Sequence, residues 1–221
     1  MKDMAAGQNI KLAVEVLSNG GVIAHPTETI FGLGAAIDSP EALRRLLSIK
    51  GRDHKKGFII LIPSREMLSK IVQPDSLLQP VTQALMDRFW PGPLTLVLPA
   101  LTNISPQLTG GSGYIALRHS SSTLVAELLE ALGGAIVSTS ANRSGGPALL
   151  DRQQVIKEFG SELGCVVSGP SLRSPLPSTV LKVTPQGSVE LLRSGAVAST
   201  SIQEVLQVFD ASLVVAAPDG S

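Results

Sequence analysis

Apolar and polar residues follow two different periods along the chain, and these periods separate expected helices from expected strands. Apolar residues three and four positions apart are typical of a helix with one buried face. At residues 39–41, a serine cap, a proline and an acid mark a helix start, and Asn19-Gly20-Gly21 marks a helix end. The helices expected from these signals cover residues 6–19, 39–49, two stretches within 64–90 interrupted near Pro74 and Pro80, 121–132, 151–159 and 201–209.

Short apolar runs bounded by glycine, proline and polar residues predict strands. They cover residues 22–25, 57–63, 94–98, 114–117, 135–137, 165–167, 179–183 and 188–192. Alternation with helices favours parallel pairing, whereas the turn at 185–187 makes an antiparallel hairpin of the last two strands. The polar, glycine-rich stretches at 26–34, 99–113 and 138–146 are expected to be loops. We therefore expect an α/β fold: a twisted, mixed parallel and antiparallel sheet flanked by helices.

Length and composition narrow the class of protein. The 221 residues contain no repeat and no low-complexity linker, so we expect one catalytic or binding domain over 1–209 and a weakly ordered tail over 210–221. Lysine plus arginine equals aspartate plus glutamate at 18 each, which disfavours a strongly basic nucleic-acid binder. Aromatic residues make up 3%, too few for a platform on which bases stack.

The absence of several sequence features argues against other classes of protein. No run approaches the roughly 18 apolar residues of a membrane span, and the first residues lack a signal-peptide core, so we expect a cytoplasmic protein with no membrane contact. The single cysteine, Cys165, lies in an apolar run and is expected in the core. The three histidines show no metal-ligand spacing, so no metal ligand is predicted.

Charged and polar residues gather at two places that could hold an anion. Residues 50–56 contain four cations within seven positions, which suits either a phosphate site or a solvated turn. Residues 138–146 combine hydroxyls, an amide and glycines, which suits either a phosphate or sugar site or an ordinary turn. Neither stretch contains a Walker loop or a dinucleotide fingerprint.

Two isolated charges stand out from a sparsely charged chain. Arg118 ends an apolar strand and is the only lysine or arginine between Arg88 and Arg143; it could pair structurally or hold a carboxylate. Glu28 is the only acid between residues 15 and 38 and could cap a turn or belong to a site. No nucleophile elbow is present, so acyl-enzyme chemistry has little support.

Six segments in fixed order carry a resemblance to a known family. They are His25-Pro-Thr-Glu-Thr-Ile-Phe-Gly-Leu-Gly34, Lys50-Gly-Arg52, Trp90-Pro-Gly-Pro-Leu-Thr-Leu-Val97, Ala116-Leu-Arg118, Ser138-Thr-Ser-Ala-Asn142 and Pro177-Ser-Thr-Val180. Together they closely resemble the YrdC-like threonylcarbamoyl-AMP synthase family in its short, single-domain form. The resemblance runs from about residue 8 to residue 196 and implies the YrdC-like fold.

The resemblance implies a nucleotidyl transfer. L-Threonine, bicarbonate or CO2, and ATP would give threonylcarbamoyl-AMP and pyrophosphate, the first step towards N6-threonylcarbamoyladenosine at position 37 of tRNA. Mg²⁺ would accompany ATP. A contact with tRNA and a downstream threonylcarbamoyl-transferase complex are the macromolecular partners that the resemblance implies.

The same resemblance assigns roles to individual residues. ATP binding falls to Lys50, Arg52, Lys56, Ser140, Asn142 and Arg193. The threonine-binding residues are Thr29, Arg118 and Ser178, with Arg118 holding the carboxylate. Lys50 and Arg52 are expected to act in catalysis. The chain departs from the common pattern at three positions: Phe31 in place of tyrosine, Leu61 in place of a threonine-contacting histidine, and Ser194 in place of a proline that would restrain Arg193.

Two other hypotheses stay open from the sequence. A non-catalytic RNA-binding or ribosome-maturation module could use the same basic concave face, although zero net charge and few aromatics count against it. An enzyme that forms a carbamoyl- or acyl-adenylate of a different amino acid would carry similar motifs.

Overall fold

The computed structural model describes residues 6–51, 57–169, 176–209 and 211–215. Its strands are β1 (Ile23–His25), β2 (Gly32–Ala36), β3 (Ile59–Leu61), β4 (Leu94–Pro99), β5 (Tyr114–Arg118), β6 (Ile136–Ser140), β7 (Cys165–Val166), β8 (Thr179–Val183), β9 (Val189–Arg193) and β10 (Leu213–Val215). Its helices are α1 (Ala6–Ser18), α2 (Pro40–Lys50), the 3-10 helix η1 (Arg65–Lys70), α3 (Pro74–Leu78), α4 (Pro80–Phe89), α5 (Pro106–Thr109), α6 (Thr123–Leu132), α7 (Arg152–Phe159) and α8 (Ser199–Gln207).

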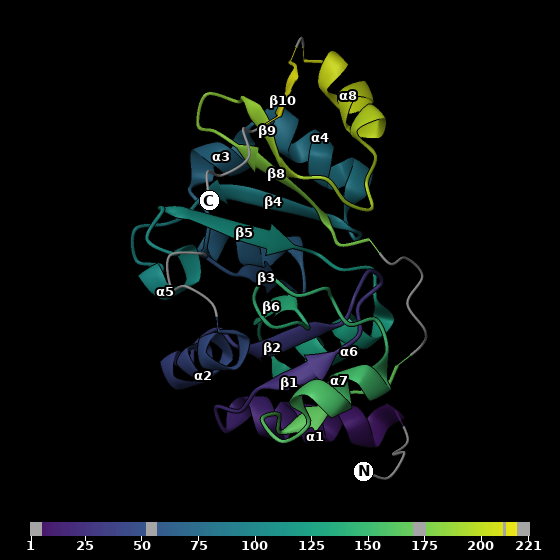
Figure 1. The fold of residues 1–221 in the computed structure, drawn as a ribbon. Helices are drawn as coiled ribbons and strands as arrows, with labels where there is room; N and C mark the ends of the chain where they lie inside the picture. The colour runs from purple at the N-terminus through teal and green to yellow at the C-terminus, as the bar shows by residue number, and fades with distance from the viewer. Residues whose placement is uncertain (1–5, 52–56, 170–175, 210, 216–221) are drawn as a thin grey trace.

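One sheet runs through the whole described chain in the order β10-β9-β8-β4-β5-β3-β6-β2-β1-β7 (Figure 1). Its pairs are parallel at β1–β7, β3–β5, β4–β8 and β9–β10, and the other pairs are antiparallel. The expected mixed sheet is therefore confirmed, including the antiparallel β8–β9 hairpin. Strands distant in sequence lie side by side at its centre, where β3 pairs with both β5 and β6.

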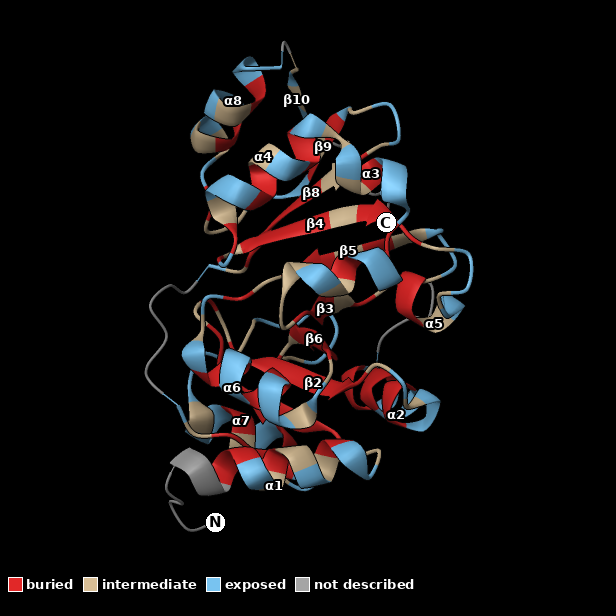
Figure 2. Cartoon of the chain, turned by 180° about the vertical axis from the view of Figure 1, so that it is seen from behind, coloured by how far each residue is buried: buried red, intermediate tan, exposed pale blue. Residues whose placement is uncertain are grey.

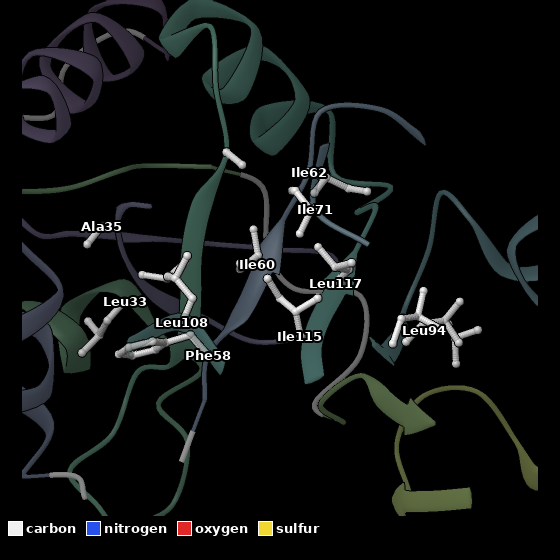
Figure 3. Close-up of a cluster of buried hydrophobic side chains, with 14 of the residues drawn as sticks. Leu33, Ala35, Phe58, Ile60, Ile62, Ile71, Leu94, Leu108, Ile115 and Leu117 are labelled. Carbon is white, nitrogen blue, oxygen red and sulfur yellow. The ribbon is translucent and has the colours of Figure 1, made fainter. Parts of the chain in front are cut away.

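Alternation along the central strands separates two apolar clusters, one on each face. Ile60 and Leu117 belong to the larger cluster, together with residues of α2 and α4. Leu61 and Ile136 belong to the smaller cluster, with residues of α1 and α6. Figure 3 shows part of the larger cluster, and Figure 2 shows buried strands beneath helices whose outer faces are exposed. Arg118 pairs in register with Leu61, so its side chain leaves the sheet on the face of the smaller cluster.

Helix α2 begins and ends where the local sequence predicts. The Ser39 Oγ accepts a hydrogen bond from the Ala42 amide at 3.3 Å, and Pro40 takes the first helical position. Gly51 then adopts a left-handed conformation with φ of 60°, which ends the helix. Lys50 is therefore the last helical residue, and its cation lies at the negative end of the helix dipole.

Two stretches expected to be loops form strands instead. Residues 32–36 form β2 and residues 138–140 extend β6, and the two strands pair antiparallel. Glycine is required at position 32 because a Cβ there would lie 2.5 Å from Ser138 Oγ and 3.0 Å from His25 Nε2. Small and polar residues hid both strands from the hydrophobic pattern, although Leu33 and Ala35 of β2 and Val137 of β6 belong to the larger apolar cluster.

Three further expectations need correction. The helical region within 64–90 has three stretches, η1, α3 and α4, rather than two; its interruptions near Pro74 and Pro80 are confirmed, and each proline takes the first helical position of the next helix, where it lacks only an amide that would be unpaired there. The expected loop at 99–113 contains the short helix α5. In the expected weakly ordered tail over 210–221, Leu213–Val215 pairs in parallel with β9 as strand β10; residues 210 and 216–221 lie outside the described part.

The backbone of Gly195 packs tightly against the segment before β8. A Cβ at Gly195 would lie 2.4 Å from the Pro177 carbonyl oxygen and 2.5 Å from Ser178 C. We therefore expect Gly195→Ala to lower the free energy of unfolding by about 1–3 kcal/mol, measured by urea denaturation. Gly134→Ala is the matched control, because a Cβ there meets nothing within 4 Å. Equal stability of the two variants would contradict this packing.

Candidate functional site

A cavity of about 490 Å³ is lined by residues of β2, β3, β5, β6, β8 and β9, and β3, β5 and β6 among them lie in the middle of the sheet. Several predicted site residues line it: Thr29, Arg118, Ser140, Ser178 and Arg193. The other lining residues include the apolar side chains of Phe31, Ile59, Leu61 and Val180. Arg52 and Lys56 lie outside the described residues, although Gly57, which follows them, also lines the cavity.

Arg118 ends β5 and is fixed on several sides. Its Nε donates to the Gly92 carbonyl at 3.2 Å, and both Nη1 and Nη2 donate to Thr29 Oγ1 at 3.2 Å. Nη2 also lies 2.8 Å from Glu28 Oε1, in an ion pair whose side chains are 6% and 11% exposed. These contacts hold the guanidinium rigidly, with Thr29 on the side that faces the cavity.

Glu28 is held as tightly as Arg118. Ser120 Oγ donates to Oε2 at 2.5 Å, and the Ser121 amide donates to Oε1 at 3.1 Å. Burial alone would raise the pKa of Glu28, but the charge of Arg118 and the hydrogen bonds from Ser120 and Arg118 outweigh it and leave the pKa below its usual value. Glu28 is therefore a carboxylate at neutral pH.

Lys50 joins the end of α2 to the loop after β6. Its Nζ donates to the Ser140 carbonyl at 2.5 Å, to the Asn142 carbonyl at 3.0 Å and to Asn142 Oδ1 at 3.1 Å. Ser140 Oγ also donates to Asn142 Oδ1 at 2.5 Å, so the three predicted nucleotide residues form one connected cluster. The backbone continues the contact, because the Ser144 amide donates to the Lys50 carbonyl at 2.9 Å.

Ser178 and Arg193 contact each other where they line the cavity. Arg193 Nη2 donates to Ser178 Oγ at 3.0 Å and to its carbonyl at 2.9 Å. Ser178 Oγ also shares a hydrogen bond of 2.8 Å with Thr95 Oγ1. Although Ser194 replaces the proline expected here, the segment stays attached, because the Ala196 amide donates to the Pro177 carbonyl at 2.9 Å. Arg193 itself is exposed.

Sequence reasoning missed several residues that support this site. Gly92 supplies the carbonyl that holds Arg118, and a Cβ at Gly92 would lie 2.4 Å from the Phe89 carbonyl oxygen. Its place in the Trp-Pro-Gly-Pro segment was the available signal. Thr95 and Ser120 left no such signal, since a single hydroxyl residue in a sequence does not reveal its partner.

Sequence reasoning also missed Arg143, whose contacts hold the end of α2 beside the cluster of Lys50, Ser140 and Asn142. Its guanidinium forms ion pairs with Glu158 at 3.0 Å and Glu162 at 2.5 Å, and it donates to the Ile49 carbonyl. It also lies over the Phe159 ring, 4.7 Å from the centroid. These contacts connect α7 to the end of α2 beside Lys50.

His25 lies fully buried behind the cavity wall, and its Nε2 is 3.2 Å from Ser138 Oγ. Burial, which penalises the charged imidazolium, lowers the pKa of His25 to about 4. The ring is therefore neutral at physiological pH. Burial likewise raises the pKa of Cys165 to about 11, and the expected core position of this thiol is confirmed.

Two further properties concern the described residues alone. Among the described residues, no group of three or more histidine, cysteine, aspartate or glutamate side chains lies close enough together to hold a metal ion. No helix in the described ranges is both long and apolar enough to cross a bilayer.

Fold and cavity together define an α/β domain with a small-molecule site lined by two arginines and several hydroxyls. Residues 15–195 match the Sua5/YciO/YrdC family model, whose description reads "Telomere recombination". The chain belongs to this family.

Named relatives and solved structures agree with the family. The chain is 39% identical to a threonylcarbamoyl-AMP synthase of Nitrosococcus oceani over 77% of this chain and 91% of that protein, and 37% identical to one of Vibrio cholerae over 87% and 100%. Pyrococcus abyssi Sua5 complexed with L-threonine has a TM-score of 0.87 at 30% identity, covering 97% of this chain. The chain spans 61% of that archaeal protein. Escherichia coli YciO has a TM-score of 0.78 at 26% identity, covering 89% of this chain and 93% of YciO.

The buried His25 should make stability depend on pH. Because its folded pKa lies below its ordinary value of 6.5, its contribution is complete above pH 6.5 and is lost as pH falls towards 4. At about 1.4 kcal/mol per pKa unit, the loss is about 3 kcal/mol. We expect a urea titration series to show a smaller pH dependence between pH 4 and 7 for His25→Gln than for wild type. Parallel curves for the two proteins would contradict the assignment.

Proposed function

We propose that the chain forms threonylcarbamoyl-AMP from L-threonine, bicarbonate or CO2, and ATP, with release of pyrophosphate. The observation that carries this proposal is one cavity whose lining includes both Arg118 and Arg193. We assign a carboxylate to the Arg118 corner of this cavity and a phosphate chain to the Arg193 corner, within a family whose named relatives are threonylcarbamoyl-AMP synthases.

The proposed chemistry needs no nucleophile from the protein. The deprotonated amine of threonine attacks CO2 and forms a carbamate, with loss of a proton from nitrogen. A carbamate oxygen then attacks the α-phosphorus of ATP, a phosphorus–oxygen bond forms, and the bond to pyrophosphate breaks. Orientation of the reactants and stabilisation of charge on the phosphates supply most of the rate enhancement in such a transfer.

Threonine is expected to bind at the Arg118 corner. A guanidinium can hold a carboxylate through two parallel hydrogen bonds, and the Nη1 and Nη2 groups that now meet the Thr29 hydroxyl form such an edge. Ser178 supplies a second polar group at the cavity wall. Leu61 lies beside Arg118 in the sheet, so the wall next to the amino acid is apolar and can receive a methyl group.

ATP is expected to lie along the cluster of Lys50, Ser140 and Asn142, with Arg193 across the cavity. The Lys50 ammonium already donates to three oxygens, so it can contact a phosphate oxygen by exchanging Asn142 Oδ1, which also accepts from Ser140. The proposal keeps Arg52 and Lys56 as phosphate ligands; both lie outside the described residues.

Mg²⁺ is the proposed companion of ATP. The described lining residues offer hydroxyls but no carboxylate, so the ion would be held by triphosphate oxygens and water. When bound, Mg²⁺ neutralises charge on the leaving pyrophosphate.

The proposed product, a mixed anhydride, must be consumed by a transferase. We propose a threonylcarbamoyl-transferase complex and contact with tRNA as partners, and the cytoplasmic location stays a prediction.

Substrate dependence tests the reaction. Purified protein with ATP and Mg²⁺ should release pyrophosphate when threonine and bicarbonate are both present, and at less than a tenth of that rate when either is omitted. Equal or faster turnover with serine or another amino acid would favour an adenylate enzyme of different specificity. Absence of pyrophosphate release, together with RNA affinity that falls steeply with salt, would favour the RNA-binding alternative.

If Arg118 binds threonine and Arg193 binds ATP, substitutions at the two arginines should change the KM of different substrates. Lysine keeps the charge of arginine but lacks its two-pronged edge, so Arg118→Lys should raise KM for threonine about tenfold and leave KM for ATP within about threefold. Arg193→Lys should show the opposite pattern. Arg44→Lys is the control, because Arg44 is exposed on α2 and pairs with Glu41. Steady-state pyrophosphate assays would measure both constants, and equal effects of the two variants on both substrates would contradict the assignment.

A further inference from the structure

The ion pair between Arg118 and Glu28 differs from other ion pairs of the described chain in its burial. Its side chains are 6% and 11% exposed, whereas Arg44–Glu41 on the surface is 58% and 74% exposed. Arg118 and Thr29 line the cavity, but Glu28 is not among the lining residues that the structure describes. Glu28 therefore lies behind the guanidinium and acts on a cavity ligand through Arg118.

Both carboxylate oxygens of Glu28 face donor groups that are themselves held in place by the fold. Oε1 meets Arg118 and the Ser121 amide, and Oε2 meets the Ser120 hydroxyl. Ser120 and Ser121 directly precede α6, whose N-terminus favours a negative charge. The carboxylate is thus held in one place and in its charged form.

The guanidinium has five N–H groups, of which four are directed at protein atoms: one from Nε, one from Nη1 and two from Nη2. Gly92 and Glu28 are not among the described residues that line the cavity, whereas Thr29 is. The Nη1 and Nη2 groups facing the cavity both meet the neutral hydroxyl of Thr29. An incoming anion can approach this edge, where the negative charge of Glu28 also repels it.

Arg193, across the same cavity, has a different environment. It is exposed, and its hydrogen bonds to Ser178 go to a hydroxyl and a carbonyl, which are neutral oxygens. The cavity therefore combines a buried guanidinium that is paired with a buried carboxylate and a second guanidinium that is more exposed.

We propose that Glu28 is a positioning and specificity residue that restricts the Arg118 corner to singly charged carboxylates and excludes phosphate groups. This inference rests on the proposed function and deepens it, since ATP, pyrophosphate and an amino acid must share one cavity. Two parallel hydrogen bonds from a fixed edge favour a carboxylate by geometry. The charge of Glu28 then opposes any anion there.

The electrostatic repulsion between Glu28 and an anion bound at Arg118 grows with the charge of that anion. Coulomb energy is proportional to the product of the charges, so a doubly charged phosphate is repelled by Glu28 twice as strongly as a carboxylate at the same distance. Removal of the Glu28 charge should therefore favour phosphate more than threonine. A purely structural role for Glu28 would weaken or leave unchanged the binding of both ligands and would not reverse their preference.

The test uses Glu28→Gln, which keeps hydrogen-bonding atoms and removes the charge. Inorganic phosphate is the probe, at saturating ATP and constant ionic strength, and its inhibition constant against threonine is measured from pyrophosphate release. We expect phosphate not to compete with threonine in the wild type. In Glu28→Gln, we expect the ratio of the phosphate inhibition constant to the threonine KM to fall at least tenfold below the lower limit that the wild type sets. Glu127→Gln, an exposed acid on α6, is the matched control and should behave as wild type.

Several results would overturn the proposal. Competition between phosphate and threonine in the wild type would do so without any variant, which covers the case in which Glu28→Gln does not fold. An unchanged ratio in folded Glu28→Gln would do the same. If wild type releases no pyrophosphate, the proposed function fails, and calorimetric titration of phosphate then decides the inference: tighter binding by Glu28→Gln than by wild type supports it, and equal binding contradicts it.

Discussion

A guanidinium at the end of a central strand, almost removed from water, is the constraint around which the site is organised. Arg118 is 5% exposed, and a charge buried to that degree is costly unless other groups compensate it. The compensation comes from three separate segments: the Gly92 carbonyl, the Thr29 hydroxyl and the Glu28 carboxylate. A buried ion pair is weak evidence for stability, since apolar residues of similar volume often serve as well. A requirement for a fixed cation at the cavity accounts better for this arrangement.

The cluster of Lys50, Ser140 and Asn142 follows a different physical principle. Lys50 is the last residue of the capped helix α2. Its ammonium donates hydrogen bonds to the carbonyls of Ser140, at the end of β6, and Asn142, in the loop that follows. Arg143 holds the same helix end from outside through acids of α7. The loop thus takes its shape from cations that bind backbone oxygens, which is how a short polar segment can keep a defined geometry beside a solvent-filled cavity.

The net charge of zero therefore describes an average. Two arginines, Arg118 and Arg193, line one cavity, and acids pair with arginines at particular places: Glu28 with Arg118, and Glu158 and Glu162 with Arg143. Such placement lets a neutral protein bind anions locally without attracting polyanions along its whole surface. The few aromatic residues and the buried, unreactive Cys165 agree with chemistry that depends on positioning small substrates.

Local sequence determined much of the fold, because caps, breakers and apolar periods act within one element. Ser39 and Pro40 mark the start of α2 in the sequence as they do in the structure. The ordered motifs also pointed to the cavity residues Thr29, Arg118, Ser140, Ser178 and Arg193. Tertiary structure alone decided strand β2 and the end of β6, since residues such as Gly32 and Ser140 give no apolar period and become part of strands only by pairing with a segment far away in the sequence. It also decided the partners: Glu28 and Arg118 are 90 positions apart, as are Lys50 and Ser140, and no local pattern encodes a contact over that distance.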